Sequence, residues 1–335
     1  WQNDRQILDE DITHPDHLVE TLKVFFEYRP PDYVEWEKAI AEFKERVPEL
    51  AAGVVGPIKR ERQTNARFIR AFADFMEKCR QSVNPNLSEQ AVEEMLIQHL
   101  LTERIFRKVF DNPDFTRRNV IANEIEKVID ALTSQSFSRE EFLRNLDRFY
   151  VAIERTAATI DDFSQKQGFL NTVYEQFFQG FSVKVADTHG IVYTPQPIVD
   201  FIVRSVEDIL QKEFGRSLSD QDVHILDPFV GTGNFIVRVM QEIKKTSLPY
   251  KYAHELHCNE VMLLPYYIAS MNIEHEYFEA TGTYHPFEGI CLVDTFDLAE
   301  ERQLSLLGEE NAARVGKQKR TPMFVIVGNP PYNAV

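Results

Sequence analysis

The amino-acid sequence predicts an α/β fold in which a helical N-terminal domain is followed by a partial Rossmann-like domain. Before residue 165, apolar residues recur at spacings of three and four, which is typical of helices that bury one face. After residue 165, short apolar strands alternate with helical stretches, which favours a mostly parallel sheet with helices on both faces. We therefore expect one domain at residues 1–165 and a second at residues 166–335.

The helical half shows three stretches with a clear helical period. Ala66 to Val83 and Ser88 to Phe110 are two of them. From Phe142 to Phe163 the apolar residues again fall on one face of a helix, and Ser138 followed by Glu141 is a capping-box start for it.

The second half contains four short apolar segments that we predict to be strands. They are Val223–Leu226, Glu255–Cys258, Gly289–Val293 and Phe324–Val327. Helices are expected over Ile198–Phe214 and Asn234–Lys245. In open parallel sheets, ligands bind at the carboxyl ends of the strands, so the residues that follow each strand are the expected binding and catalytic residues.

The charge balance excludes simple coating of nucleic acid, because the formal net charge is −16 over 335 residues. Local DNA binding stays open, and basic clusters occur at residues 59–62 and 317–320, although each alone is more typical of solvated surface. The three cysteines show neither metal-ligand spacing nor a disulfide framework, so we expect no metal and a reducing cytoplasm. No apolar run approaches the roughly 20 residues of a membrane span, so we expect no membrane partner.

A glycine-containing loop follows the first predicted strand. Asp227 and Pro228 end the strand, Gly231 and Gly233 lie in the loop, and a predicted helix begins at Asn234. Glycines let the backbone approach a ligand closely, and a helix N-terminus favours a carboxylate. The spacing excludes a phosphate-binding P-loop, and the strand, loop and helix context favours a ligand-binding loop over a chance pair of glycines.

Acidic residues follow the next two strands. Glu260 can accept two hydrogen bonds from ribose hydroxyls, as acidic residues do in other nucleotide-binding sheets. Asp294 can accept a hydrogen bond from an adenine amino group. Phe296 can either pack on the ring of that adenine or simply fill the core, and the sequence leaves both open.

An Asn-Pro-Pro-Tyr turn follows the fourth strand, at residues 329–332. An exocyclic amine on a purine is a poor nucleophile because its lone pair is delocalised into the ring. The side-chain oxygen of Asn329 and the carbonyl of Pro330 can each accept one N–H and so favour a more nucleophilic amine. Pro331 helps to fix the turn, and Tyr332 can stack on a base. The turn therefore indicates transfer chemistry at a planar amine.

These motifs, in this order, resemble the N6-adenine DNA methyltransferases with the gamma-type motif order, an amino-methyltransferase family. The residues from Gly190 to Pro197 are similar to the motif that precedes the cofactor loop in that subgroup. The resemblance implies S-adenosylmethionine as cofactor, with Thr194, Asp227 and the loop from Gly231 to Gly233 around its methionine part. It implies Glu260 at the ribose and Asp294 at the cofactor adenine.

More narrowly, Gly168–Phe178 and Asp187–Pro195 resemble Type ISP restriction–modification enzymes, which join nuclease, translocase, helical coupler, methyltransferase and target-recognition parts in one polypeptide. This implies that the first half is the coupler and that the partners are double-stranded DNA and the rest of the parent polypeptide. The sequence starts at Trp1 and stops three residues after Tyr332, so we expect an interior fragment that is inactive alone.

Two other function classes remain open from the sequence. The same turn serves methylation of a glutamine side chain in a protein or of a base amine in RNA. A non-catalytic coupling module between a DNA translocase and a DNA-reading domain would also need a helical first half. A cytosine-C5 mechanism is disfavoured, because neither Cys258 nor Cys291 lies in a Pro-Cys loop.

Overall fold

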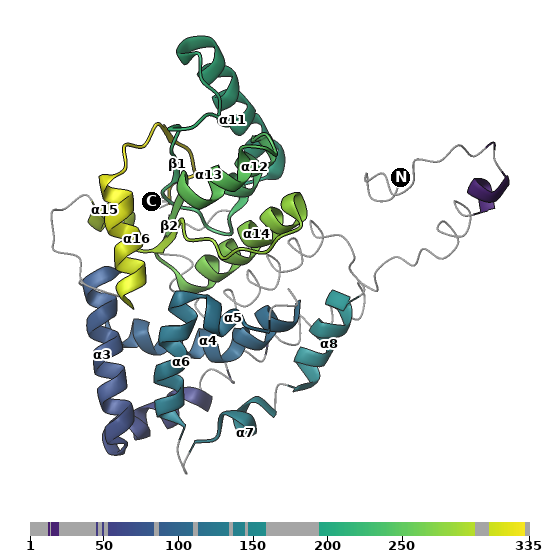
Figure 1. The fold of residues 1–335 in the computed structure, drawn as a ribbon. Helices are drawn as coiled ribbons and strands as arrows, with labels where there is room; N and C mark the ends of the chain where they lie inside the picture. The colour runs from purple at the N-terminus through teal and green to yellow at the C-terminus, as the bar shows by residue number, and fades with distance from the viewer. Residues whose placement is uncertain are drawn as a thin grey trace.

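A computed structural model describes most of the chain, in segments (Figure 1). The described residues are 13, 15–19, 45, 49, 53–83, 87–109, 113–133, 137–144, 147–158, 194–298 and 308–331.

The described residues of the N-terminal part are mostly helical. A helix over residues 53–64 is followed by α3 (Ala66–Ser82), α4 (Glu89–Val109), α5 (Phe115–Arg118), α6 (Val120–Leu132), α7 (Arg139–Arg144) and α8 (Asp147–Ala158). Asparagine side chains begin two of these helices: Asn65 accepts hydrogen bonds from the amides of Arg67 and Phe68, and Asn119 accepts one from Ala122. Such caps satisfy amides that lack a partner within the helix.

The expected helices at 66–83 and 88–110 are confirmed as α3 and α4, apart from Phe110, which lies outside the described residues. The expected helix from Phe142 to Phe163 is covered by α7 and α8. Residues 145–146 and 159–193 lie outside the described residues, so the continuity of that helix stays a prediction.

The second part alternates helices with four strands. Its elements are α11 (Gln196–Ile209), the π-helix η1 (Leu210–Phe214), β1 (Ile225–Asp227), α12 (Asn234–Glu242), α13 (Leu248–His254), β2 (Leu256–Glu260), α14 (Leu263–Thr281), β3 (Ile290–Leu292), α15 (Thr295–Leu298), α16 (Gly308–Arg320) and β4 (Val325–Ile326). All four predicted strands and both predicted helices are present, so the α/β fold class is confirmed.

The four strands form one parallel sheet in the order β3-β2-β1-β4. The chain runs outward from β1 through β2 to β3 and then crosses to place β4 on the other side of β1. The carboxyl ends of β1 and β4 therefore meet at a topological switch point, where ligands of open α/β sheets bind.

The two parts share one continuous apolar core among the described residues. Helix α14 lies between the sheet and the helical part, packed against β2, β3, α12 and α4 (Figure 1). Helix α16 packs on β3 and on α6.

No helix in the described ranges is both long enough and apolar enough to cross a bilayer.

Candidate active site

The sequence-predicted site residues follow the carboxyl ends of all four strands. Asp227 ends β1, Glu260 ends β2, Asp294 follows β3 and Asn329 follows β4. Because the strands are parallel, these residues share one edge of the sheet.

Asp227 is fully buried at the end of the central strand. Its Oδ1 accepts a hydrogen bond from the amide of Phe229 at 3.0 Å, while its Oδ2 has no hydrogen-bond partner among the described residues. Burial, with a smaller contribution from Glu260, raises the pKa of Asp227 to about 7. A buried carboxylate with an unused oxygen is costly unless a cation or a donor approaches it.

The glycine loop is held by Glu260. One oxygen of Glu260 accepts a hydrogen bond from the amide of Gly231 at 3.0 Å, and the other accepts from the amides of Val261 and Met262 at the start of α14. Burial nevertheless raises the pKa of Glu260 to about 7. The oxygen that accepts from Gly231 has a second lone pair and remains able to accept a ligand hydroxyl, whereas the other oxygen already accepts two hydrogen bonds.

Both glycines of the loop adopt positive φ, which L side chains rarely do. A side chain at Gly231 (φ +55°) would point into open space, which is where a ligand can approach the backbone. At Gly233 (φ +97°) a Cβ atom would lie 3.2 Å from the Cα of Ala269, so that glycine permits close packing on α14.

A second set of contacts ties the three strand ends β1, β2 and β3 together. The side-chain nitrogen of Asn259 donates to the hydroxyl of Thr295 at 3.2 Å, and that hydroxyl donates to the backbone carbonyl of Pro228 at 2.6 Å. Sequence reasoning assigned no role to Asn259 or Thr295, although each lies beside a predicted site residue. The side-chain oxygen of Asn259 is buried without a partner among the described residues.

Phe296 is 64% exposed, so it does not fill the core, which was one of the two expectations for it. It packs against Phe229 of the glycine loop, with ring centroids 5.2 Å apart. Asp294 accepts a hydrogen bond from the amide of Phe296 at 3.0 Å, and its own amide donates to the carbonyl of Val83 in the helical part.

The Asn-Pro-Pro turn lies against the end of β1. A Cβ atom at Gly328 would lie 2.4 Å from Oδ1 of Asp227, so only glycine allows the turn to approach this closely. Asn329 donates from its side-chain nitrogen to the hydroxyl of Thr194 at 3.1 Å. Gly328 is thus a site residue that sequence reasoning missed, because the contact joins strands about 100 residues apart.

Pro330 and Pro331 are exposed. Tyr332 lies outside the described residues, as does the segment from Gly190 to Tyr193. The predicted roles of these residues stay predictions.

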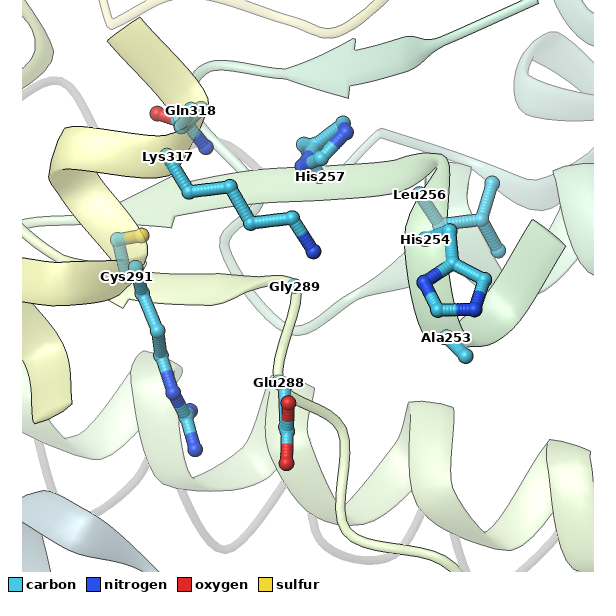
Figure 2. Close-up of a pocket in the computed structure, with 10 residues that line it drawn as sticks. Ala253, His254, Leu256, His257, Glu288, Gly289, Cys291, Lys317 and Gln318 are labelled. Carbon is cyan, nitrogen blue, oxygen red and sulfur yellow. The ribbon is translucent and has the colours of Figure 1, made fainter. Parts of the chain in front are cut away.

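A pocket between α13 and α16 lies at the opposite edge of the sheet (Figure 2). Lys317 and His257 line it, together with Glu288 and Arg314. Burial, assisted by the nearby His224 and Lys317, lowers the pKa of His257 to about 4. None of the sequence-predicted site residues lines this pocket, so it is separate from the strand-end site.

Groups of three or more His, Cys, Asp or Glu side chains arranged to hold a metal do not occur in the described ranges.

Comparison with family models assigns both parts of the chain. Residues 33–165 match the coupler domain of Type ISP restriction–modification enzymes. Residues 165–335 match the N-6 DNA methylase family. The chain belongs to the N-6 DNA methylase family. No curated protein matches this chain.

Three solved structures resemble the chain over most of its length. A DrdV–DNA complex is 37% identical with a TM-score of 0.84 over 99% of the chain. The ATP-dependent Type ISP enzyme LlaBIII bound to DNA is 36% identical with a TM-score of 0.78 over 87%. A nuclease-deletion mutant of the Type ISP enzyme LlaGI, in complex with a DNA substrate mimic, is 33% identical with a TM-score of 0.73 over 95%.

This chain spans only 33%, 20% and 26% of the lengths of these three solved chains, respectively. It therefore corresponds to one part of much larger enzymes.

Proposed function

We propose that this chain is the coupler and the cofactor-binding half of a site-specific adenine-N6 DNA methyltransferase that uses S-adenosylmethionine. The observation that carries the proposal is the junction between the two halves of the site. Gly328 brings the Asn-Pro-Pro turn onto Asp227, and Asn329 is anchored through its nitrogen to Thr194. Anchoring the nitrogen leaves the side-chain oxygen of Asn329 as an acceptor for a target amine.

The strand-end site fits the cofactor. Asp227 and Glu260 are buried carboxylates with raised pKa values and no ion-pair partner among the described residues, an arrangement that favours a cationic ligand. The open space at Gly231 lets such a ligand approach the loop, and exposed Phe296 offers a face for an aromatic base. S-adenosylmethionine supplies an electrophilic methyl group together with a sulfonium, an ammonium, ribose hydroxyls and an adenine.

Each site residue then has a task that its position allows. Asp227 accepts from the ammonium, Glu260 from the ribose hydroxyls, and Asp294 from the cofactor adenine. The target adenine cannot be reached inside the duplex, so it must be flipped out, at a cost of a few kcal/mol. Asn329 and the carbonyl of Pro330 accept the two N–H groups of its amine, and Tyr332 stacks on its ring. Fixed acceptors of this kind act through electrostatic preorganisation.

We further propose that the substrate is double-stranded DNA and that the parent polypeptide supplies nuclease, translocase and target-recognition parts. The support is that solved relatives are DNA complexes of chains about three to four times as long. On this proposal, residues 1–335 alone do not complete a reaction, and the enzyme acts where its DNA lies, in the prokaryotic cytoplasm.

The helical half supports a second, compatible role. Its match to the Type ISP coupler domain favours a mechanical link between a translocase and the methyltransferase. Methylation of protein glutamine or of RNA gains no comparable support.

One experiment separates these possibilities. The full-length parent is incubated with methyl-labelled S-adenosylmethionine and, in parallel, with duplex DNA, RNA and protein, and the labelled DNA is digested to nucleosides. We expect label in DNA as N6-methyl-2′-deoxyadenosine. Label in RNA or protein, or in DNA as N4-methylcytosine, would refute the proposal.

A further inference from the structure

Helix α14 (Leu263–Thr281) holds two successive residues of the glycine loop. The side chain of Asn272, which is fully buried, donates to the carbonyl of Thr232 at 2.8 Å. The backbone of Ala269 lies against Gly233. The preceding residue, Gly231, is held from the end of β2, where Glu260 accepts from its amide. A rotation or shift of α14 would therefore move Thr232 and Gly233.

The opposite side of α14 is held by the helical part. At about 100° per residue, Tyr267 lies on a different face from Ala269 and Asn272. Tyr267 is fully buried, and its ring packs edge-on against Phe106 and Phe115 at 5.6 and 5.0 Å between centroids. Its hydroxyl lies 2.8 Å from Nδ1 of His99 on α4.

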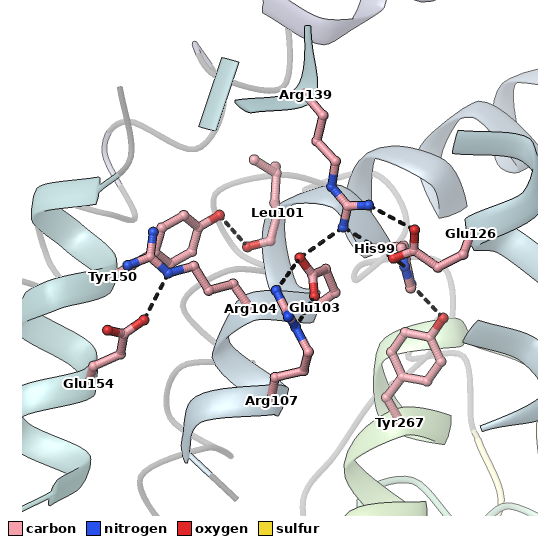
Figure 3. Close-up of polar contacts among 10 residues, drawn as sticks. All are labelled: His99, Leu101, Glu103, Arg104, Arg107, Glu126, Arg139, Tyr150, Glu154 and Tyr267. Carbon is pink, nitrogen blue, oxygen red and sulfur yellow. Dashed lines mark hydrogen bonds and ion pairs between the residues drawn. The ribbon is translucent and has the colours of Figure 1, made fainter. Parts of the chain in front are cut away.

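His99 is the first member of a partly buried series of polar contacts that runs through the helical part (Figure 3). Its Nε2 lies 2.9 Å from Glu126 on α6, which also receives two hydrogen bonds from Arg139 on α7. Arg139 also donates to Glu103 on α4 at 2.8 Å. The hydrogen bonds from His99 and Arg139 lower the pKa of Glu126 to about 2 in spite of its burial.

The two ring nitrogens of His99 join Tyr267 to Glu126, at 2.8 and 2.9 Å. In the neutral tautomer that donates from Nε2 to Glu126, Nδ1 accepts from the hydroxyl of Tyr267. The helical part therefore specifies one orientation of Tyr267, and through it one position of α14.

We propose that His99 and Tyr267 are positioning residues through which the helical part fixes the glycine loop, so that cofactor binding and the packing of the helical part on α14 are thermodynamically coupled. The identity of the ligand rests on the proposed function. Coupling of this kind is reciprocal: a ligand that tightens the loop also tightens the contact between α14 and α4.

The test compares two variants of the full-length parent that each delete one buried hydroxyl. Tyr267→Phe removes the link to His99 and keeps the ring. Tyr150→Phe is the matched control, because Tyr150 is equally buried in the helical part and its hydroxyl donates to the carbonyl of Leu101 at 2.9 Å rather than to His99.

We expect Tyr267→Phe to weaken binding of S-adenosylmethionine by about five-fold or more in calorimetry, within the usual range of allosteric coupling. The KM for the cofactor should rise while kcat at saturating cofactor stays within about twofold of wild type, since the loop contacts no target base. Tyr150→Phe should change neither value. Adding His99→Leu to Tyr267→Phe should cause little further loss, because both break the same link.

Amide hydrogen exchange of the glycine loop provides a second test, which can be carried out without cofactor. Exchange of residues 228–236 should rise in Tyr267→Phe and in His99→Leu, and stay unchanged in Tyr150→Phe. Unchanged loop exchange in the first two variants, or an equal effect in all three, would overturn the inference. Failure of the wild-type enzyme to bind S-adenosylmethionine would instead overturn the proposed function, and the exchange result would still decide the link.

Discussion

At the scale of single residues, the site depends on one close approach between two strands. Gly328 and Asp227 touch because Gly328 has no side chain. On the proposed function, this contact makes the position of the Asn-Pro-Pro turn depend on Asp227, so a change in either part of the site should affect the other.

We predict that Gly328→Ala lowers the rate of methylation by about tenfold or more, because a Cβ atom 2.4 Å from Oδ1 of Asp227 must displace the turn. Single-turnover methylation by the parent enzyme measures the effect. Gly316→Ala in α16 is the control, since its Cβ would meet only the flexible end of Arg320. Equal rates in the Gly328→Ala variant and the wild type would show that the contact has no role in catalysis.

Asp227 should make cofactor binding depend on pH. Its pKa is raised to about 7, and a cationic ligand binds the ionised form more tightly, so affinity should fall as pH drops through 7. One group with this pKa gives a loss of about tenfold in affinity between pH 8 and pH 6. Calorimetry at the two pH values tests this. Asp227→Asn should bind weakly and lose most of the dependence, whereas a constant affinity in the wild type would contradict the charge argument.

At the scale of elements, the glycine loop owes its shape to two residues with positive φ. We predict that Gly231→Asn weakens cofactor binding by about tenfold, because asparagine tolerates this conformation but projects a side chain into the open space. Gly215→Asn is a close control, since Gly215 has φ +61° and also faces open space, at the end of η1. If both variants bind the cofactor like wild type, the loop serves packing only.

The strands could be located from the sequence to within one or two residues, because each is a short apolar run that leads into a distinctive polar motif. Helix α14 could not. It is buried between the sheet and the helical part, so apolar residues surround it and no stripe marks its faces. Helix α16 was missed for the opposite reason, because it is polar along most of its length. Its packing depends partly on a polar residue near its start: Asn311 bonds to both the amide and the carbonyl of Leu292.

The site residues at strand ends could likewise be named from the sequence, since a parallel sheet gathers them at one edge. Their mutual contacts could not. The links from Asn329 to Thr194 and from Thr295 to Pro228 join segments far apart in the chain, and only the packed fold brings them together.

At the scale of the whole molecule, the net charge of −16 repels the DNA backbone, so any binding of DNA must come from local basic groups. The structure places Lys317, Lys319 and Arg320 in the last turn of α16, all of them exposed. Lys317 also reaches over the pocket beside His257 (Figure 2).

We predict that residues 1–335 bind duplex DNA weakly, without sequence preference, and less as salt rises. Replacing the three basic residues with glutamine should reduce the slope of log affinity against log salt by up to about three, since each phosphate contact contributes about one. Titration of random and cognate duplexes at two salt concentrations measures this. Tight, salt-insensitive preference for one duplex would move target recognition into the helical half.

We propose above that the Asn-Pro-Pro turn activates the target amine beside a cofactor that other residues hold. The most direct measurement is single-turnover methylation of DNA by the parent enzyme carrying Asn329→Ala, with cofactor affinity measured on the same protein and exposed Asn123→Ala on α6 as control. We predict a loss of about 10²–10³ in rate with cofactor affinity within about threefold of wild type. Methylation within a fewfold of wild type, or a loss explained entirely by weaker cofactor binding, would contradict the account.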